Sequence, residues 1–211
     1  MAGFFEGFFK KKRVVDKAGK DASGSAPGET VRMGCFAGEA IRWRILKREE
    51  DRLLLLSVCA LDTRSYHDAF EDVFWADCAI RDWLNGEFYE TVFSGEEKAR
   101  IIRCRVTTAD STLYKTRGGP DSEDRLFLLS LEEAREFKAV NEENMCLPTA
   151  HARERGAYTN ETCDNCWWWL RTPARWQNKA LTIDSQGEVN MYGRRVDTDV
   201  VTVRPAMWVH V

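Results

Sequence analysis

Cys163 to Pro173 reads Cys-Asp-Asn-Cys-Trp-Trp-Trp-Leu-Arg-Thr-Pro, and this stretch decides the fold that we expect. Successive side chains of an extended segment point to opposite faces, so three adjacent tryptophans cannot all enter one core. We therefore expect Trp167 and Trp169 on one face of a strand and Trp168 on the other. Two arrangements fit this pattern: a strand buried between two layers with one tryptophan at its rim, or a strand that presents a tryptophan beside arginine at a binding surface.

The composition predicts one folded domain with a tail. The chain has 211 residues, of which 44% are hydrophobic and 31% are charged. Its formal net charge of −3 gives no overall bias toward nucleic acid, so we expect no nucleic-acid partner. No apolar run is long enough to span a bilayer or to serve as a secretory signal. We therefore interpret the seven cysteines as reduced thiols of a cytoplasmic protein.

The first 30 residues differ in composition from the rest. Phe4, Phe5, Phe8 and Phe9 share a helical face and are followed at once by the basic run 10–13. One hypothesis is weak, peripheral contact of residues 1–13 with an anionic membrane surface. The alternative, which we favour, is a flexible or docking tail with a linker. We expect residues 1–30 to form this tail and residues 31–211 to form a single domain.

Along residues 31–211, the patterns predict a mixed α+β domain with two or three short helices and long loops. Alternation over 41–45 indicates a half-buried strand, which pairs as a hairpin with the apolar run 53–61. Asp77 is a candidate helix cap, and Ser94 and Ser130 each begin a capping-box pattern. The remaining expected strands are 101–108, 126–129, 168–173, a hairpin of 180–183 with 188–191, and 200–211, which Pro205 interrupts.

Five motifs carry a resemblance to a known family. In chain order they are Ile41-Arg-Trp-Arg-Ile45, Ile80-Arg-Asp-Trp-Leu-Asn85, Phe127-Leu-Leu-Ser130, Trp168-Trp-Leu-Arg-Thr-Pro173 and Val203-Arg-Pro-Ala-Met-Trp208. The set resembles an uncharacterised bacterial family, a domain of unknown function. The resemblance implies a C-type-lectin-like fold of the formylglycine-generating-enzyme type, in which the first and last strands pair and long loops form a binding face. Relatives with that fold include the variable proteins of diversity-generating retroelements, whose C-terminal segment carries diversified ligand-binding residues.

Together with the residue patterns, this fold predicts a core, two structural arginines and a binding face. We expect Trp168, Leu170 and Trp208 in the core, and residues 200–211 paired with Ile41–Lys47. Arg171 and Arg204 are expected to be partly buried and held by carboxylates or backbone carbonyls. The predicted ligand-binding residues combine aromatic area with adaptable hydrogen bonding: Arg175, Trp176, Gln177, Asn178, Asn190, Tyr192 and Arg194. The expected ligand is a protein or a small molecule, and the alternative is an ordinary polar surface hairpin.

The chain offers no convincing catalytic set of nucleophile, base and stabiliser, so we predict a non-catalytic module without a cofactor. One alternative is a metal- or cysteine-dependent enzyme of the formylglycine-generating type. Its candidate zinc ligands are Cys146, His151, Cys163 and Cys166, although their spacing is not diagnostic of a zinc site. The residues that flank Cys163 and Cys166 also differ from the paired cysteines that the enzyme branch uses.

Overall fold

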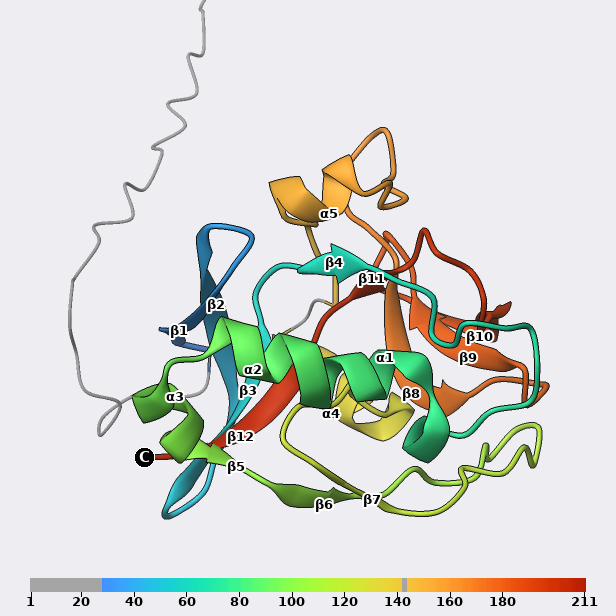
Figure 1. Cartoon of the computed structure of the whole chain (residues 1–211). Helices are drawn as coiled ribbons and strands as arrows, with labels where there is room; N and C mark the ends of the chain where they lie inside the picture. Colours follow the sequence, from blue (N-terminus) through green and yellow to red (C-terminus); the bar gives the residue numbers. More distant parts are fainter. Residues whose placement is uncertain (1–27, 142–143) are drawn as a thin grey trace, which may run out of the picture.

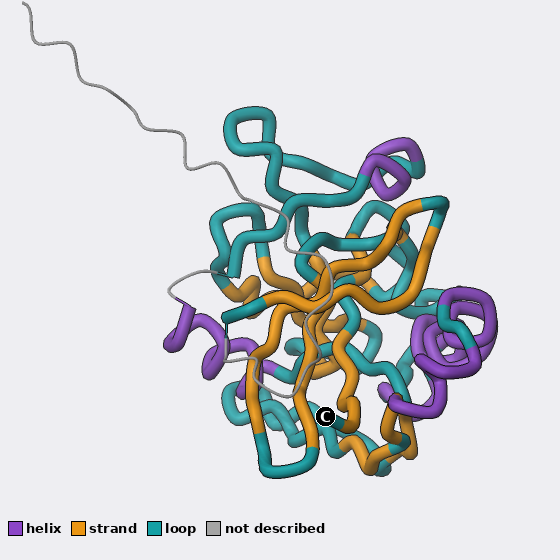
Figure 2. The backbone as a smooth tube through the Cα atoms, turned by 90° about the vertical axis from the view of Figure 1, so that its left-hand side faces the viewer, coloured by secondary structure: helices purple, strands orange, loops and turns teal. Residues whose placement is uncertain are grey.

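The computed structural model describes residues 28–141 and 144–211, and residues 1–27 of the predicted tail 1–30 lie outside them. The described chain is α+β: two five-stranded sheets, a two-stranded ribbon and short helices (Figure 1). Strands gather in the centre and helices lie around them, as Figure 2 shows. None of the described helices has the length and apolar character needed to cross a membrane.

The first sheet has the order β1-β2-β3-β12-β5, and every neighbouring pair in it is antiparallel. Its strands are β1 (Thr30–Phe36), β2 (Glu39–Arg48), β3 (Arg52–Ser57), β12 (Ala206–His210) and β5 (Ile101–Ile102). The alternation predicted for 41–45 is confirmed, because Ile41, Trp43 and Ile45 are buried while Arg42 is exposed. The predicted hairpin is β2 with β3, and β3, which is paired on both edges, is almost wholly buried.

The second sheet has the order β10-β9-β8-β11-β4, with β8 at its centre. Its strands are β10 (Val189–Arg195), β9 (Lys179–Ile183), β8 (Trp168–Pro173), β11 (Thr202–Val203) and β4 (Asp62–Thr63). Every residue of β8 is buried, and Trp167, just before it, is half-buried. The tryptophan segment is therefore the strand buried on both faces, with one tryptophan at its rim.

Short helices and a ribbon complete the fold. They are α1 (Ala79–Trp83), α2 (Tyr89–Val92), α3 (Gly95–Arg100), α4 (Leu131–Asn141), α5 (Ala150–Glu154), β6 (Cys104–Val106) and β7 (Ser122–Asp124). A 3₁₀ turn at Trp75–Asp77 precedes α1, and a π-turn at Leu84–Phe88 joins α1 to α2. Both capping boxes are confirmed, with reciprocal bonds between Ser94 and Glu97 and between Ser130 and Glu133. Asp77 does not cap α1, because it lies inside the 3₁₀ turn, and the helix begins after Cys78.

The predicted pairing of the first and last strands is wrong. Residues 206–210 pair with β3, from Ala206 opposite Leu56 to His210 opposite Arg52, while Ile41–Lys47 in β2 lies one strand further away. The central position of β3 explains this, since its hydrogen-bonding groups on both edges need partners and β2 meets only one edge. The C-terminal strand still enters the sheet built by the N-terminal strands.

Candidate functional site

Two of the seven predicted ligand-binding residues are large aromatic side chains at the surface. Trp176, in the connection between β8 and β9, is 48% exposed, and Tyr192, on β10, is 69% exposed. β10 is the edge strand of the second sheet, and its register places Arg195 opposite Lys179, next to that connection. The β8–β9 connection and the C-terminal end of β10 therefore lie next to each other at one end of the β9–β10 hairpin.

Cationic side chains stack on the exposed aromatic rings of this region. The Arg175 guanidinium carbon lies 4.8 Å from the centroid of the Trp176 ring, and Lys179 Nζ lies 4.7 Å from the same ring. Arg194 stacks on Trp167 at 4.2 Å, and Tyr158 meets that ring edge-on at 6.0 Å. Within the described chain, Arg175, Lys179 and Arg194 form no ion pair, so their charges are open to an outside group.

Three predicted ligand-binding residues have bonds that shape the surface from within. Gln177 Nε2 donates to Val73 O at 3.0 Å, and the backbone carbonyl of Asn178 accepts from Val196 N at 3.1 Å. Asn190 Oδ1 accepts from the backbone N–H of Tyr192 at 3.2 Å, next to an irregularity in the β9–β10 register. These bonds hold the β8–β9 connection and the bulged edge strand in place.

Gly193 makes the bulge of β10 feasible. Its φ of +66° is unfavourable for other residues, and a Cβ there would lie 2.3 Å from the Ala174 side chain. The two neighbouring predicted residues, Tyr192 and Arg194, are both exposed because the strand bulges at this glycine. We give the name aromatic–cationic surface to a set of residues from the segment before β8, the β8–β9 connection and the β9–β10 hairpin: Trp167, Arg175, Trp176, Lys179, Tyr192 and Arg194.

The four zinc candidates do not form one cluster: the thiols of Cys146 and Cys166 are neighbours, and Cys163 and His151 lie elsewhere. Cys163 Sγ contacts Ser185 O at 3.7 Å, whereas Cys166 Sγ turns into the core and contacts Cys146 O at 3.2 Å. His151 lies on α5, with Nε2 3.6 Å from Asp62 Oδ1. Across residues 28–141 and 144–211, no group of three or more His, Cys, Asp or Glu side chains could hold a metal ion.

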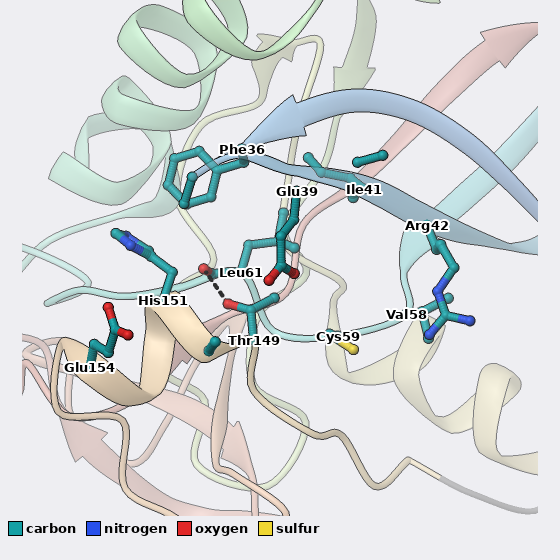
Figure 3. A pocket seen from close by; sticks show the side chains of 13 residues that line it. Phe36, Glu39, Ile41, Arg42, Val58, Cys59, Leu61, Thr149, His151 and Glu154 are labelled. Carbon is teal, nitrogen blue, oxygen red and sulfur yellow. Dashed lines mark hydrogen bonds between the residues drawn. The ribbon is translucent and has the colours of Figure 1, made fainter.

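A pocket of about 310 Å³ lies between the tip of the β1–β2 hairpin and α5 (Figure 3). Its apolar wall includes Phe36, Ile41 and Leu61, and its charged lining includes Glu39, Arg42 and Glu154. Phe36 and His151 face each other at one end, with ring centroids 5.2 Å apart, and Arg42 lies at the other end (Figure 3). The residue patterns did not predict this pocket, because more than a hundred residues separate its two walls in the chain.

The pocket also contains a thiol. Burial, followed by the neighbouring Cys146, raises the pKa of half-buried Cys59, and Arg42 lowers it only in part. Glu39, Arg42 and Glu154 make no side-chain hydrogen bond or ion pair within the part of the chain that the structure describes. The pocket therefore presents two carboxylates, a guanidinium, the His151 imidazole and a neutral thiol to whatever enters it.

A buried carboxylate fixes the α5 wall of this pocket. Asp62 Oδ1 accepts from Arg155 Nε at 2.7 Å and from Thr63 N at 2.8 Å. Arg155 follows α5 directly, and Asp62 begins β4, so this ion pair ties the short helix to the second sheet.

Comparison with known proteins gives one match. A family model described as a domain of unknown function, DUF6273, matches residues 50–211. No curated protein and no solved structure matches the chain.

Proposed function

The chain belongs to the DUF6273 family of domains of unknown function, and we propose that its domain is a non-catalytic binding module for a protein partner. The contact is made by the aromatic–cationic surface. Trp, Tyr and Arg are the residue types that contribute most to binding energy in protein interfaces. The proposal depends above all on one observation: exposed Trp176 lies under two cations that form no ion pair with carboxylates of the described chain.

The charge of the surface indicates what kind of partner fits. Arg175, Lys179 and Arg194 supply three positive charges, while Arg195 is already paired with Asp197 at 2.6 Å. A segment with acidic side chains beside an apolar residue complements this surface, because its carboxylates meet the guanidiniums and its apolar group covers the rings. The overall charge of −3 shows that this basic character is local.

Substitution of the two exposed aromatic residues tests the proposal. Peptides selected from a random library against the wild-type domain should be acidic and should lose affinity for Trp176→Ala and for Tyr192→Ala. We expect each substitution to weaken binding by roughly thirtyfold or more, the effect of removing an interface hot spot. Thermal melting should be unchanged, because neither side chain belongs to the core.

Leu113→Ala is the matched control, since Leu113 is also exposed but lies outside the surface. The selected peptides should bind this variant as they bind the wild type. Equal binding of the peptides to the two aromatic variants, or a selection that yields no binder, contradicts the proposal. Unfolding of both aromatic variants assigns these side chains to the core instead.

We also propose that the domain has a C-type-lectin-like scaffold and is related to the retroelement variable proteins. Its support is the position of β12 inside the sheet of the N-terminal strands, which closes the domain on itself, together with the exposed surface at Arg175–Asn178 and Asn190–Arg194. Sequencing the gene and its neighbours in several strains tests the retroelement role. A nearby reverse transcriptase gene and codon changes confined to these positions are expected, and their joint absence overturns that role.

A reducing compartment, such as the cytoplasm, is part of the same proposal. All seven cysteines are free thiols, and Cys146 and Cys166 remain unpaired although their backbones are hydrogen-bonded at 2.8 Å.

A further inference from the structure

We propose that the pocket between the β1–β2 hairpin and α5 binds a small zwitterion of the ω-amino-acid class, whose ammonium and carboxylate groups stand at opposite ends of a short carbon chain. The ammonium group lies on the side of the pocket that holds Glu39 and Glu154, and the carboxylate lies at Arg42. This site is separate from the aromatic–cationic surface, shares no residue with it, and does not depend on the binding of a protein partner.

The size and lining of the pocket suit a small molecule. Ligand pockets in proteins commonly measure roughly 300–1,000 Å³ and combine apolar walls with a few polar groups. The volume of about 310 Å³ stands at the lower end of that range, so a metabolite of amino-acid size fills it. Phe36, Ile41 and Leu61 supply the apolar wall against which the carbon chain of such a molecule packs.

The charged groups are distributed along the length of the pocket. Glu39 points its carboxylate into the space between the hairpin and α5, and Glu154 lies on the helix at the end of the pocket where His151 lies (Figure 3). Arg42 follows Glu39 by three residues on β2, which places their backbones about 10 Å apart along the strand. A ligand that lies along the pocket therefore meets negative charge at Glu39 and Glu154 and positive charge at the end formed by Arg42.

This distribution discriminates between classes of small molecule. A dicarboxylate places one of its carboxylates against Glu39, and a diamine places one of its ammonium groups against Arg42. Like charges at such close range are unfavourable, and a molecule with one charge of each sign avoids both contacts.

The site is held open before any ligand binds. Thr149 Oγ1 donates to Leu61 O at 3.0 Å, and the Thr149 backbone N–H donates to Ala60 O at 2.9 Å, so the start of α5 is fixed to the floor of the pocket. Asp62 holds the other end of the helix through Arg155. A preformed pocket loses little conformational entropy on binding.

Three probes of equal chain length test the charge assignment by titration calorimetry: 5-aminovalerate, 1,5-diaminopentane and glutarate. They carry one charge of each sign, two positive charges and two negative charges, respectively. We expect 5-aminovalerate to bind at least about tenfold more tightly than either of the others, because only this probe satisfies both ends. Tightest binding of the diamine or of glutarate, or no binding of any probe, overturns the proposal.

Variants assign the two ends of the ligand. Glu39→Gln and Arg42→Gln should each weaken 5-aminovalerate binding by about tenfold or more, the usual effect of losing a charged hydrogen-bonding partner. Glu132→Gln and Arg117→Gln are matched controls, because these residues are exposed outside the pocket, and they should bind the probe as the wild type does. All four positions are exposed, so the folded state is expected to be intact. Unchanged affinity of the Glu39 and Arg42 variants overturns the assignment.

Cys59 reports directly on occupancy of the pocket. Its alkylation by iodoacetamide, followed peptide by peptide with mass spectrometry, should slow when 5-aminovalerate is present. Exposed Cys163 lies outside the pocket and should react at the same rate with or without the probe. If 5-aminovalerate binds but Cys59 reacts at an unchanged rate, the probe occupies another site and the proposal fails.

Discussion

Arg171 is the residue on which the junction of β8 and α4 depends. Its guanidinium is 6% exposed. It donates from Nη1 to Leu128 O at 2.7 Å and to Glu133 Oε2 at 2.5 Å, and from Nη2 to Thr107 O at 3.0 Å. Glu133 also accepts from the Ser130 backbone N–H at 2.7 Å, so one carboxylate both neutralises the arginine and caps the helix. The predicted role of Arg171 as a structural arginine is confirmed.

Glu133→Gln should therefore destabilise the domain by about 3 kcal/mol, because it leaves a buried guanidinium without its counter-charge. Its neighbour Glu132 is exposed on the same helix and provides the control. Glu132→Gln should change the free energy of unfolding by less than about 0.5 kcal/mol. Urea denaturation of both variants measures the difference, and equal stability would show that the ion pair contributes nothing net.

For single residues, the sequence predicts the chemical character of a side chain better than its position in the structure. Arg171 and Arg204 follow from their place among apolar residues, since a buried guanidinium must find acceptors. Gln177 is predicted as a ligand-binding residue, and the structure adds that its side chain anchors the β8–β9 connection to Val73. Glu39 and Glu154 were not singled out, because an unpaired glutamate looks the same in sequence whether it faces bulk water or a pocket.

Among the elements, α3 shows that a residue of a local capping motif can also make a tertiary contact. The capping box of Ser94 and Glu97 is readable from four residues, but Glu97 Oε1 also accepts from the backbone N–H of Gly34 at 2.7 Å. Gly34 has a φ of +74° at the irregularity between β1 and β2, so the carboxylate joins the helix to a distorted strand. Burial alone raises the pKa of Glu97, but the bonds from Gly34 and Ser94 outweigh it and lower the pKa below its usual value.

The lowered pKa gives a pH-dependent prediction. Since the unfolded chain holds the Glu97 proton more tightly, the stabilisation is complete above the ordinary pKa of 4.5 and is lost as the pH falls through the lower folded value. Glu97→Gln should cost about 1 kcal/mol at neutral pH and almost nothing in strong acid, where the wild-type carboxyl is also neutral. Denaturation of both proteins across this range checks the prediction, and a pH-independent difference contradicts it.

Predictions for whole elements succeeded where the signal lies within a few residues. The alternation at 41–45 and both capping boxes are local, and all three are confirmed. The partner of the last strand is not a local property. It depends on which strand edge remains unpaired once the sheet forms. The sequence therefore predicts β2 as the partner, whereas the structure shows β3.

In the whole molecule, one segment belongs to both sheets. Residues 202–203 form β11 in the second sheet, and residues 206–210 form β12 in the first. Between them, Arg204 Nε donates to Ser57 O at 3.0 Å, and Pro205 O accepts from Ser57 N at 3.0 Å. Leu61 N donates to Val203 O at 2.9 Å, so the passage from β3 to β4 runs alongside this segment. Two adjacent, hydrogen-bonded crossings connect the sheets.

We therefore expect the two sheets to unfold together. Leu55→Ala, at a fully buried position of β3, should cost about 2–5 kcal/mol. Hydrogen exchange at Leu181 and Ile183 of β9, in the other sheet, should lose protection by the same free energy. Unaltered protection in β9 would mean that the second sheet is a separate cooperative unit.

The position of β12 also has a consequence for biosynthesis. A ribosome makes β1, β2 and β3 in succession, but the strand that fills the free edge of β3 is made about 150 residues after it. The nascent chain thus leaves the exit tunnel with an apolar, half-paired β-sheet that cannot be completed until translation has passed His210. During that interval, strand exchange between neighbouring polysomal chains and capture by chaperones compete with correct closure.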